Sequence, residues 1–365
     1  MAVGSAVPLA DGAAPFVLDT AAAMARAFAP WFDLLDQRFL LSYVAAGCFV
    51  LVFTAMARIV QRRRIRVRAI VRLLFRRSVW LHRSSLLDYK LYLLNMGLSV
   101  LMLGVLVVSV PLWGATVEAG LSMVAPPSSI EPGWLAAGVV AALLVLAMDF
   151  GYWLCHLLMH KIGFLWEFHK LHHSALVMTP ATEYRQHPVE ILLFPNVQAV
   201  TVGVAYGAAS HWMGHAVVST ALPGYAVVVL VHFFSFHHLR HSHVNIAFTG
   251  VLGRLLHSPA HHLIHHSDNQ AHFDRNMGYL LSIWDWMAGT LVMPVRGQRV
   301  TLGIGPEGAE HDTVFHSLWR PVRRSWSHLR PASPAGAATP PPGLPPLPPP
   351  TPATPPALSP ASPAA

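Results

Sequence analysis

The sequence predicts an all-α integral membrane protein: a helical bundle of about four to five spans with a cytoplasmic, histidine-rich helical cap that holds a dinuclear metal site. Of its 365 residues, 54% are hydrophobic and only 12% are charged, whereas about a quarter of the residues of a soluble domain are charged. Its long apolar segments match the roughly 20 helical residues that cross a ~30 Å hydrocarbon core. Its 23 histidines gather in clusters that mostly follow the ends of these segments.

Apolar length and charge together predict the topology. The stretch from 61 to 90, with QRRRIRVR and VRLLFRR, is the densest basic loop beside any span, and such loops favour the cytoplasmic side. We therefore expect an N-terminus outside and histidine clusters on the cytoplasmic face. The membrane that we expect is a bacterial inner membrane. The expected spans are residues 40–60, 92–113, 134–157, 191–209 and 216–236.

Composition also divides the chain into parts. Arg and Trp mix in RPVRRSWSHLR, which fits either a segment on an anionic membrane surface or a solvated basic tail. The residues after it are almost wholly Pro, Ala, Ser, Thr and Gly, a composition typical of disorder. The basic runs flank apolar segments, so the net charge of +8 does not predict a nucleic-acid partner. The parts are an N-terminal segment (1–39), N-terminal membrane helices (40–132), a domain that carries the histidine clusters (133–300), a basic segment (301–330) and a Pro-rich tail (331–365).

The first histidine pair has helical spacing. His156 and His160 lie four residues apart, so a helix places both imidazoles on one face, where they suit one metal or two adjacent metals. His211 and His215 have the same spacing, but they fall at the expected outer tip of a helical hairpin. We expect the first pair, and not the second, to bind metal.

Two later clusters repeat the pattern H-x2-HH. In a helix, the first two histidines of this pattern share a face while the third points about 100° away, so that one motif can reach two metals. Buried core histidines would each need hydrogen-bonding partners, so a metal site explains the repetition better. The two copies are His169, His172 and His173, and His262, His265 and His266.

The remaining cluster, HFFSFHHLRHSHVN, is crowded. Its pair with helical spacing, His237 and His241, provides our candidate ligands. The competitors within this cluster, for which surface or supporting roles are expected, are His232, His238 and His243, and the expected bystanders before the last motif are His257 and His261.

These motifs resemble those of the fatty acid hydroxylase superfamily, also called the sterol desaturase family, whose members are integral membrane di-iron oxygenases. The resemblance covers roughly residues 149–294, and bacterial sterol-desaturase-like proteins are similar throughout. Beyond the histidines it rests on Asp149, on RQHP at 185–188, on RHSH at 240–243, on SP at 258–259 and on DRN, WD and GT between 274 and 290. It implies two Fe ions held by His156, His160, His169, His172, His173, His241, His262, His265 and His266, with His237 as a tenth ligand in a motif that varies among relatives.

About ten neutral imidazoles can hold two metals and leave coordination positions open for O2. Imidazole suits Fe, Cu, Ni and Zn, so iron is implied by the resemblance alone. Carboxylates normally orient metal-bound histidines through their second ring nitrogen, and Asp149, seven residues before His156, is the first candidate. Further candidates for such supporting roles are His187, Asp274 and Asn276, together with Glu183, Asp268 and Asp285.

The resemblance implies hydroxylation or desaturation of an unactivated C–H position of a lipid with O2; sterol-like, fatty acyl, carotenoid and ether lipids all remain open. The sequence has no C-x-x-C-H, no cysteine set for an iron–sulfur cluster and no Gly-rich dinucleotide fingerprint. An external ferredoxin-like or cytochrome electron donor is therefore expected. The alternative is a histidine-rich membrane metal transporter or metal-binding regulator, although transport ligands are expected near the bilayer midplane.

Overall fold

The computed structural model describes residues 44, 46–52, 54–56, 67–106, 109–295 and 297–329. Within these ranges the chain is helical, with two isolated bridges and no β-strand, which confirms the all-α prediction. The expected N-terminal segment (1–39), the Pro-rich tail and part of the first expected span lie outside the described residues.

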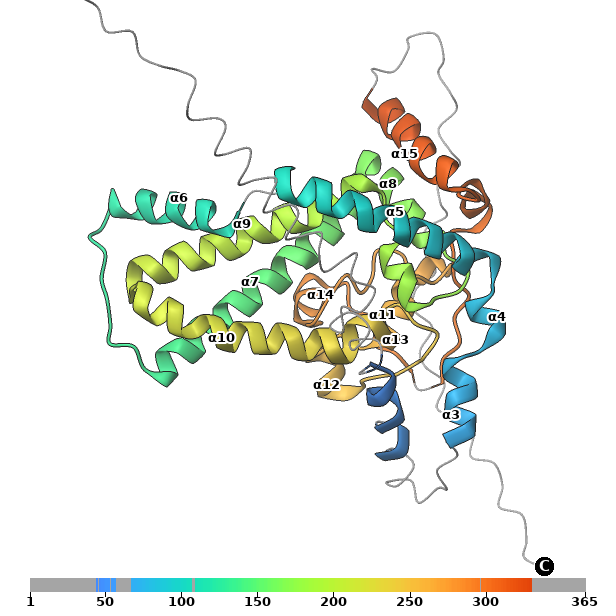
Figure 1. The fold of residues 1–365 in the computed structure, drawn as a ribbon, viewed down its shortest axis with the longest axis horizontal. Helices are drawn as coiled ribbons and strands as arrows, with labels where there is room; N and C mark the ends of the chain where they lie inside the picture. Colours follow the sequence, from blue (N-terminus) through green and yellow to red (C-terminus); the bar gives the residue numbers. More distant parts are fainter. Residues whose placement is uncertain are drawn as a thin grey trace, which may run out of the picture. The chain divides into compact units, whose positions relative to one another are not determined.

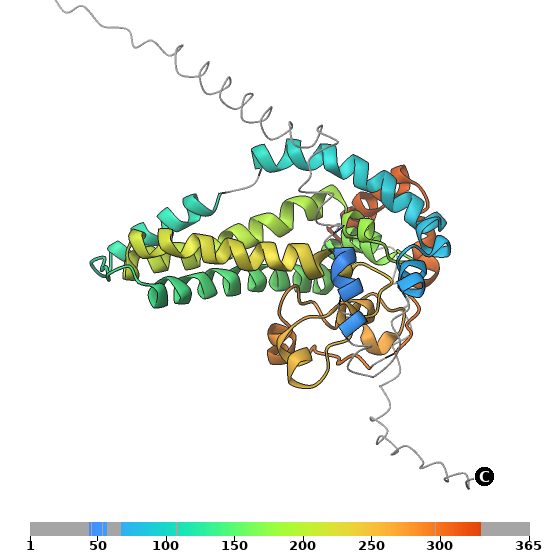
Figure 2. The ribbon, with the colours of Figure 1, turned by 60° about the horizontal axis from the view of Figure 1, so that its bottom comes forward.

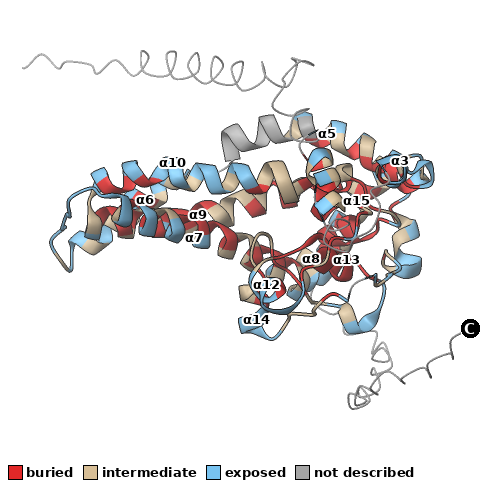
Figure 3. Cartoon of the chain, turned by 90° about the horizontal axis from the view of Figure 1, so that it is seen from below, coloured by how far each residue is buried: buried red, intermediate tan, exposed pale blue. Residues whose placement is uncertain are grey.

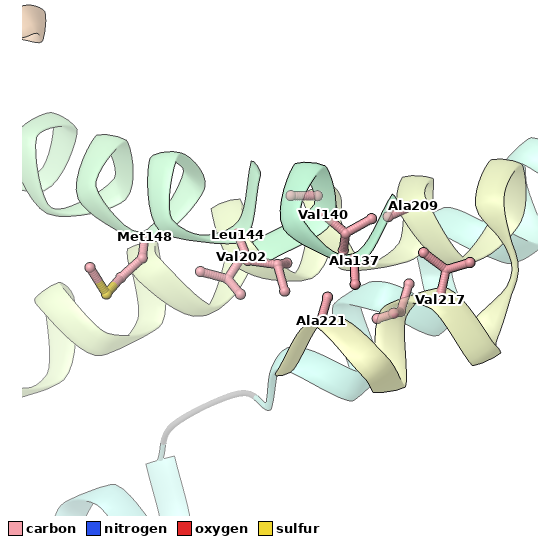
Figure 4. Packing of buried hydrophobic residues seen from close by; sticks show 10 residues of the cluster. Ala137, Val140, Leu144, Met148, Val202, Ala209, Val217 and Ala221 are labelled. Carbon is pink, nitrogen blue, oxygen red and sulfur yellow. The ribbon is translucent and has the colours of Figure 1, made fainter. Parts of the chain in front are cut away.

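Among the described residues, three helices are long and apolar enough to cross a membrane: α7 (Trp134–Lys161), α9 (Pro188–Met213) and a continuous run from His215 to Arg240. This run comprises α10 (His215–His232), a π-helical turn η2 (Phe233–His237) and α11 (His238–Arg240). The helices α7, α9 and α10 lie side by side (Figures 1 and 2). Small and branched apolar side chains fill the space between them, including Ala137, Leu144 and Val202 (Figure 4).

The expected span over residues 92–113 is not one helix, and that prediction is wrong. α5 (Arg83–Leu106) ends before α6 (Val110–Ser122) begins. Ser109 caps α6, because its Oγ accepts a hydrogen bond from the Leu112 amide, and Pro111 stands in the first turn. Both residues are typical of a helix start.

Glycines allow α6 to pack closely on α9. A Cβ atom on Gly207 would stand 2.3 Å from the carbonyl oxygen of Gly114, and one on Gly203 would stand 2.3 Å from the Cβ of Trp113. The two backbones therefore approach each other where no larger side chain fits.

Shorter helices form a cap at the end of the bundle where α7 ends and α9 begins (Figure 1). Its most buried part lies around α8 and α13 (Figure 3). The cap contains α8 (Gly163–His173), η1 (Pro180–Tyr184), α12 (Gly250–Leu255), α13 (Pro259–His265), η3 (Gln270–His272), α14 (Ile283–Ala288) and η4 (Gly305–Glu310), and α3 (Val67–Leu74) and α4 (Arg77–Trp80) precede α5.

The basic segment near 320–330 belongs to α15 (Val314–Leu329), which packs on α8. Its buried face carries Ser317, Pro321 and Ser325. Trp319 and Trp326 are exposed on the other side.

Candidate metal centre

Nine of the ten histidines proposed as ligands from the sequence come together in two groups. Within each group, one potential ligand atom per residue lies within 4.8 Å of all the others. The five-histidine group contains His156, His160, His169, His173 and His265, and the four-histidine group contains His172, His241, His262 and His266. Eight of the nine are buried, and His160 is half-buried.

Two short helices contribute histidines to both groups. On α8, His169 and His173 join the five-histidine group while His172 joins the other. At α13, His262 and His266 join the four-histidine group while His265 joins the five-histidine group. Each H-x2-HH motif therefore reaches two groups, as predicted. The histidines that share a group are spaced i, i+4, however, and not i, i+3 as expected.

The second ring nitrogen of His169 is held by a glutamate at the start of α9. His169 Nδ1 donates to Glu190 Oε2 at 2.6 Å, and Glu190 Oε1 accepts from the His187 amide at 2.9 Å. His187 and Glu190 form the capping box of α9, so His187 supports His169 only through Glu190. Glu190 was not among the residues predicted to support the histidines, although a glutamate three residues after a helix N-cap is a recognisable signal.

One segment after α13 holds three more rings of the five-histidine group. His160 Nδ1 donates to Asp274 Oδ1 at 3.3 Å. The backbone carbonyls of Arg275 and Met277 accept from His265 Nδ1 at 2.7 Å and from His156 Nδ1 at 2.8 Å. Of the supporting residues expected from the sequence, Asp274 thus contacts a candidate ligand directly.

Hydrogen bonds to a side-chain amide and a side-chain carboxylate hold this segment after α13 in place. Asn276, at φ 57°, donates from Nδ2 to the carbonyl of His261 at 3.1 Å. Asp285 accepts from the Met277 amide at 3.0 Å and from the Gly278 amide at 2.8 Å. Both residues therefore act on the histidines through the backbone.

Asp149 contacts the same region rather than a histidine. Its carboxylate accepts from the Leu280 amide at 2.7 Å and from Trp284 Nε1 at 2.9 Å. Its expected role as a direct partner of His156 is taken by the Met277 carbonyl, and Asp149 instead anchors α7 to the loop that supplies it.

A buried carboxylate supports the four-histidine group. Glu183, on η1, contacts His241 Nδ1 and accepts from Arg240 Nη2 at 3.1 and 3.2 Å. Burial alone would raise the pKa of Glu183, but the adjacent Arg240 guanidinium holds this pKa well below its usual range. The guanidinium lies over the rings of Tyr152 and Tyr279, 4.9 and 4.6 Å from their centroids.

The tenth histidine, His237, lies outside both groups. Its Nδ1 is 2.9 Å from the Tyr279 hydroxyl. The end of α11 at Arg240 explains the separation from His241, because His241 is the C-cap of α11 with a non-helical backbone (φ −96°, ψ 64°) and so does not continue the helical face of His237.

The histidines expected to have other roles also lie outside the two groups. His215 Nε2 is 3.0 Å from Glu118, and His211 Nδ1 is 3.5 Å from Ser122 Oγ. His243 is bonded to the carbonyl of Leu73, and His261 caps α13. The two groups contain none of these residues, nor His232, His238 or His257.

The distances between the ring nitrogens that face one another fit those of nitrogens bound to one metal. The carbonyl and carboxylate acceptors at Nδ1 place a proton there on His156 and His169, so the two rings face each other through their Nε2 atoms, which lie 3.1 Å apart. In the other group His241 Nε2 is 2.9 Å from His172 Nε2 and 2.7 Å from His262 Nε2. Adjacent nitrogens at right angles on one metal would be about 3.0 Å apart for bonds of about 2.1 Å.

Histidines need to be neutral to bind a metal. Burial holds the pKa values of His262, His265 and His266 well below the usual range for histidine. The Nε2 atoms of His160, His173 and His265 are buried without a hydrogen-bond partner in the described part of the chain. A bound cation would satisfy them.

A cavity of about 310 Å³ borders the five-histidine group. Besides His160, His173 and His265, its lining includes Lys170 and Glu307, which form an ion pair at 2.9 Å. The cavity gives small polar molecules room beside this group.

Comparison with known proteins identifies the central part of the chain. Residues 141–290 match the family model for fatty acid hydroxylase. Alkylglycerol monooxygenase of Homo sapiens is 26% identical over 185 residues, which are 50% of this chain and 35% of that protein. The Caenorhabditis elegans alkylglycerol monooxygenase is 26% identical over 180 residues, 47% of this chain and 31% of its own.

A bacterial relative is similar over the same extent of the chain. The ornithine lipid hydroxylase OlsE of Rhizobium tropici is 30% identical over 171 residues, 47% of this chain and 47% of that protein. The matches thus span about a third of the alkylglycerol monooxygenases and about half of the ornithine lipid hydroxylase. No solved structure is significantly similar. Residues 141–290, which carry the nine clustered histidines, are therefore a domain of the fatty acid hydroxylase family, as the resemblance of the motifs led us to expect.

Proposed function

We propose that this chain is a membrane-bound di-iron oxygenase that hydroxylates a lipid with O2 and externally supplied electrons. The observation that carries the proposal is the convergence of nine histidines in two buried groups, in which ring nitrogens face one another. The matched relatives are named as lipid hydroxylases or monooxygenases, which favours hydroxylation over desaturation. Their names also favour a fatty acyl or ether lipid over a sterol or carotenoid.

Iron bound by these histidines would supply the one-electron chemistry with O2 that the side chains lack. The protein's own part is to hold the nine imidazoles buried and aimed inward. Glu183, Glu190 and Asp274 do so by accepting or contacting the Nδ1 atoms, and burial excludes water from the rings. The overall reaction balances as R–H + O2 + 2 electrons + 2 protons giving R–OH + H2O.

The electrons come from a separate donor under this proposal, either ferredoxin-like or a cytochrome. The proposed catalytic domain, residues 133–300, would face the cytoplasm of a bacterium from its inner membrane, with residues 40–132 as additional membrane helices. The basic residues between 61 and 90 support this orientation.

The position of the histidines favours an enzyme over a transporter. His156 lies 22 residues after Trp134 on α7, which is about 33 Å along a helix and so about the full thickness of the hydrocarbon core. Both groups thus lie at one end of the long helices, whereas transport sites are formed near the bilayer midplane.

Metal analysis and lipid profiling test the proposal. We expect the protein purified in detergent to contain two irons per chain, and cells that produce it to accumulate a lipid heavier by one oxygen. His266→Ala should abolish that product, whereas His215→Ala, which alters a histidine outside both groups, should leave it unchanged. A single zinc per chain, with no oxygenated lipid after supply of iron and reductant, would refute the proposal.

A further inference from the structure

A second cavity, of about 430 Å³, lies largely outside the family domain. One wall comes from the helical residues 46–51 and another from α3, Phe75 and Trp80. The third wall is formed by Pro180 and residues 238–244. The volume falls in the range of small-molecule sites, roughly 300–1,000 Å³.

The lining is almost wholly apolar, and its hydroxyl group is already satisfied. The side chains include Leu51, Leu74 and Val244. Ser242 Oγ donates to the Leu239 carbonyl at 2.7 Å, and His243 Nε2 is 2.6 Å from the Leu73 carbonyl. These two polar side chains are therefore occupied by backbone groups, so the cavity suits hydrocarbon rather than a polar headgroup.

The inner wall is made by the segment that carries His241, one member of the four-histidine group, and by the start of η1. Leu239 and Ser242 flank His241, and Pro180 begins the short helix that carries Glu183, whose carboxylate contacts His241 Nδ1. A molecule in the cavity would lie behind the residues that position this part of the metal centre.

We propose that this cavity binds the hydrocarbon chain of a lipid, and that the helical residues 46–51 together with α3, Phe75 and Trp80 thereby contribute a substrate-binding wall that the family domain lacks. That the bound hydrocarbon chain belongs to the substrate rests on the proposed function. It assigns chain binding to the side of the four-histidine group and leaves the polar cavity beside the five-histidine group to small polar molecules.

Gly47 offers a direct way to fill the cavity. It lines the cavity, and no atom of the described residues lies within 4 Å of the position that its Cβ would take. Gly47→Phe therefore adds a ring in open space. Gly138→Phe is the matched control, because Gly138 is an exposed helical glycine of α7 with equally open surroundings among the described residues.

The probe is hexadecanoic acid that carries a diazirine near its methyl end, added to the full-length protein in phosphatidylcholine nanodiscs. After irradiation, labelled peptides are mapped by mass spectrometry with and without excess unlabelled hexadecanoic acid. We expect saturable labelling of residues 46–51, 71–80 and 238–244. Displacing about two methylene groups should weaken this labelling about tenfold in Gly47→Phe, and Gly138→Phe should match the unaltered protein.

Iron content, measured on the same samples, separates the two proposals. If iron is bound but labelling of these segments is not competed away, or is equal in Gly47→Phe, the chain-binding inference is wrong. If labelling is saturable and sensitive to Gly47→Phe in a protein that binds no iron, the cavity binds a chain and the oxygenase proposal fails.

Discussion

The hydrogen bond from His169 to Glu190 provides a sharp test of the metal centre. In Glu190→Gln, one oxygen can still accept from the His187 amide, as Oε1 does now. The other position becomes an NH2 donor facing His169 Nδ1, which now donates to Oε2 at 2.6 Å. To accept from this donor, the ring has to move its proton to Nε2, the nitrogen that faces His156. A protonated Nε2 cannot bind metal.

The expected magnitude is a 10- to 100-fold loss of metal affinity, the usual effect of removing a partner of a metal-bound histidine, or about 1.4 to 2.7 kcal/mol. The metal-free protein should unfold at nearly the same temperature, because the helix cap is retained. Glu118→Gln is the matched control. It alters another Glu–His pair, with 3.0 Å between Glu118 Oε1 and His215 Nε2, but this pair is largely exposed.

The assay is an anaerobic titration of metal-free protein with Fe²⁺ in competition with a chelator. Two results would refute the reasoning: an unchanged affinity in Glu190→Gln, or an equal loss in Glu118→Gln. Either would mean that the proton on His169 is not set by Glu190, or that the five-histidine group does not bind metal.

Three other measurements follow from the structure. Asp274→Asn should weaken iron binding less than Glu190→Gln, because the Asp274 carboxylate is 39% exposed and 3.3 Å from His160 Nδ1; equal losses in the titration would contradict this order. Gly207→Val should lower the melting temperature, with a cost of about 1–3 kcal/mol for overpacking, while Gly138→Val should not; equal melting curves would rule out the close contact of α6 with α9. Burial lowers the pKa of His261 to about 4, and an unfolded histidine has a pKa of about 6.5. The unfolded chain therefore binds the proton first, and stability of the metal-free protein should fall in denaturant titrations as the pH drops from about 6.5 toward 4; stability that rises over this interval would contradict the burial of this ring.

The sequence contained enough to predict the all-α architecture and the convergence of the histidine clusters. The lengths of the apolar segments and the basic residues at 61–90 predict that the ends of α7 and α11 lie on the same side of the membrane. Nine of the ten candidate histidines lie in the two groups. The break at Ser109 was also visible, because Ser-Val-Pro is a helix start, but the apolar residues on both sides of it outweighed that signal.

The partners of the histidines were harder to predict because several are backbone atoms. The carbonyls of Arg275 and Met277 reach His265 and His156 through a loop whose positive φ angles at Asp274 and Asn276 depend on the contacts of the folded chain. Hydrophobic periodicity carries no information on such a loop. The exclusion of His237 likewise depends on the end of α11 before His241, which the spacing of the two histidines did not reveal.

Under the proposed function, the sharing of α8 and α13 between the two groups would link the loading of one metal to the loading of the other. A cation bound by His169 and His173 would fix the rotation of α8, and with it the direction of the intervening His172, a member of the other group. At α13, His265 stands in the same relation to His262 and His266. Any ordering of these two helices by the first ion would be spared the second, which is the condition for positive cooperativity. A half-loaded centre would be a minor species, and the protein would pass from empty to full over a narrow range of iron concentration.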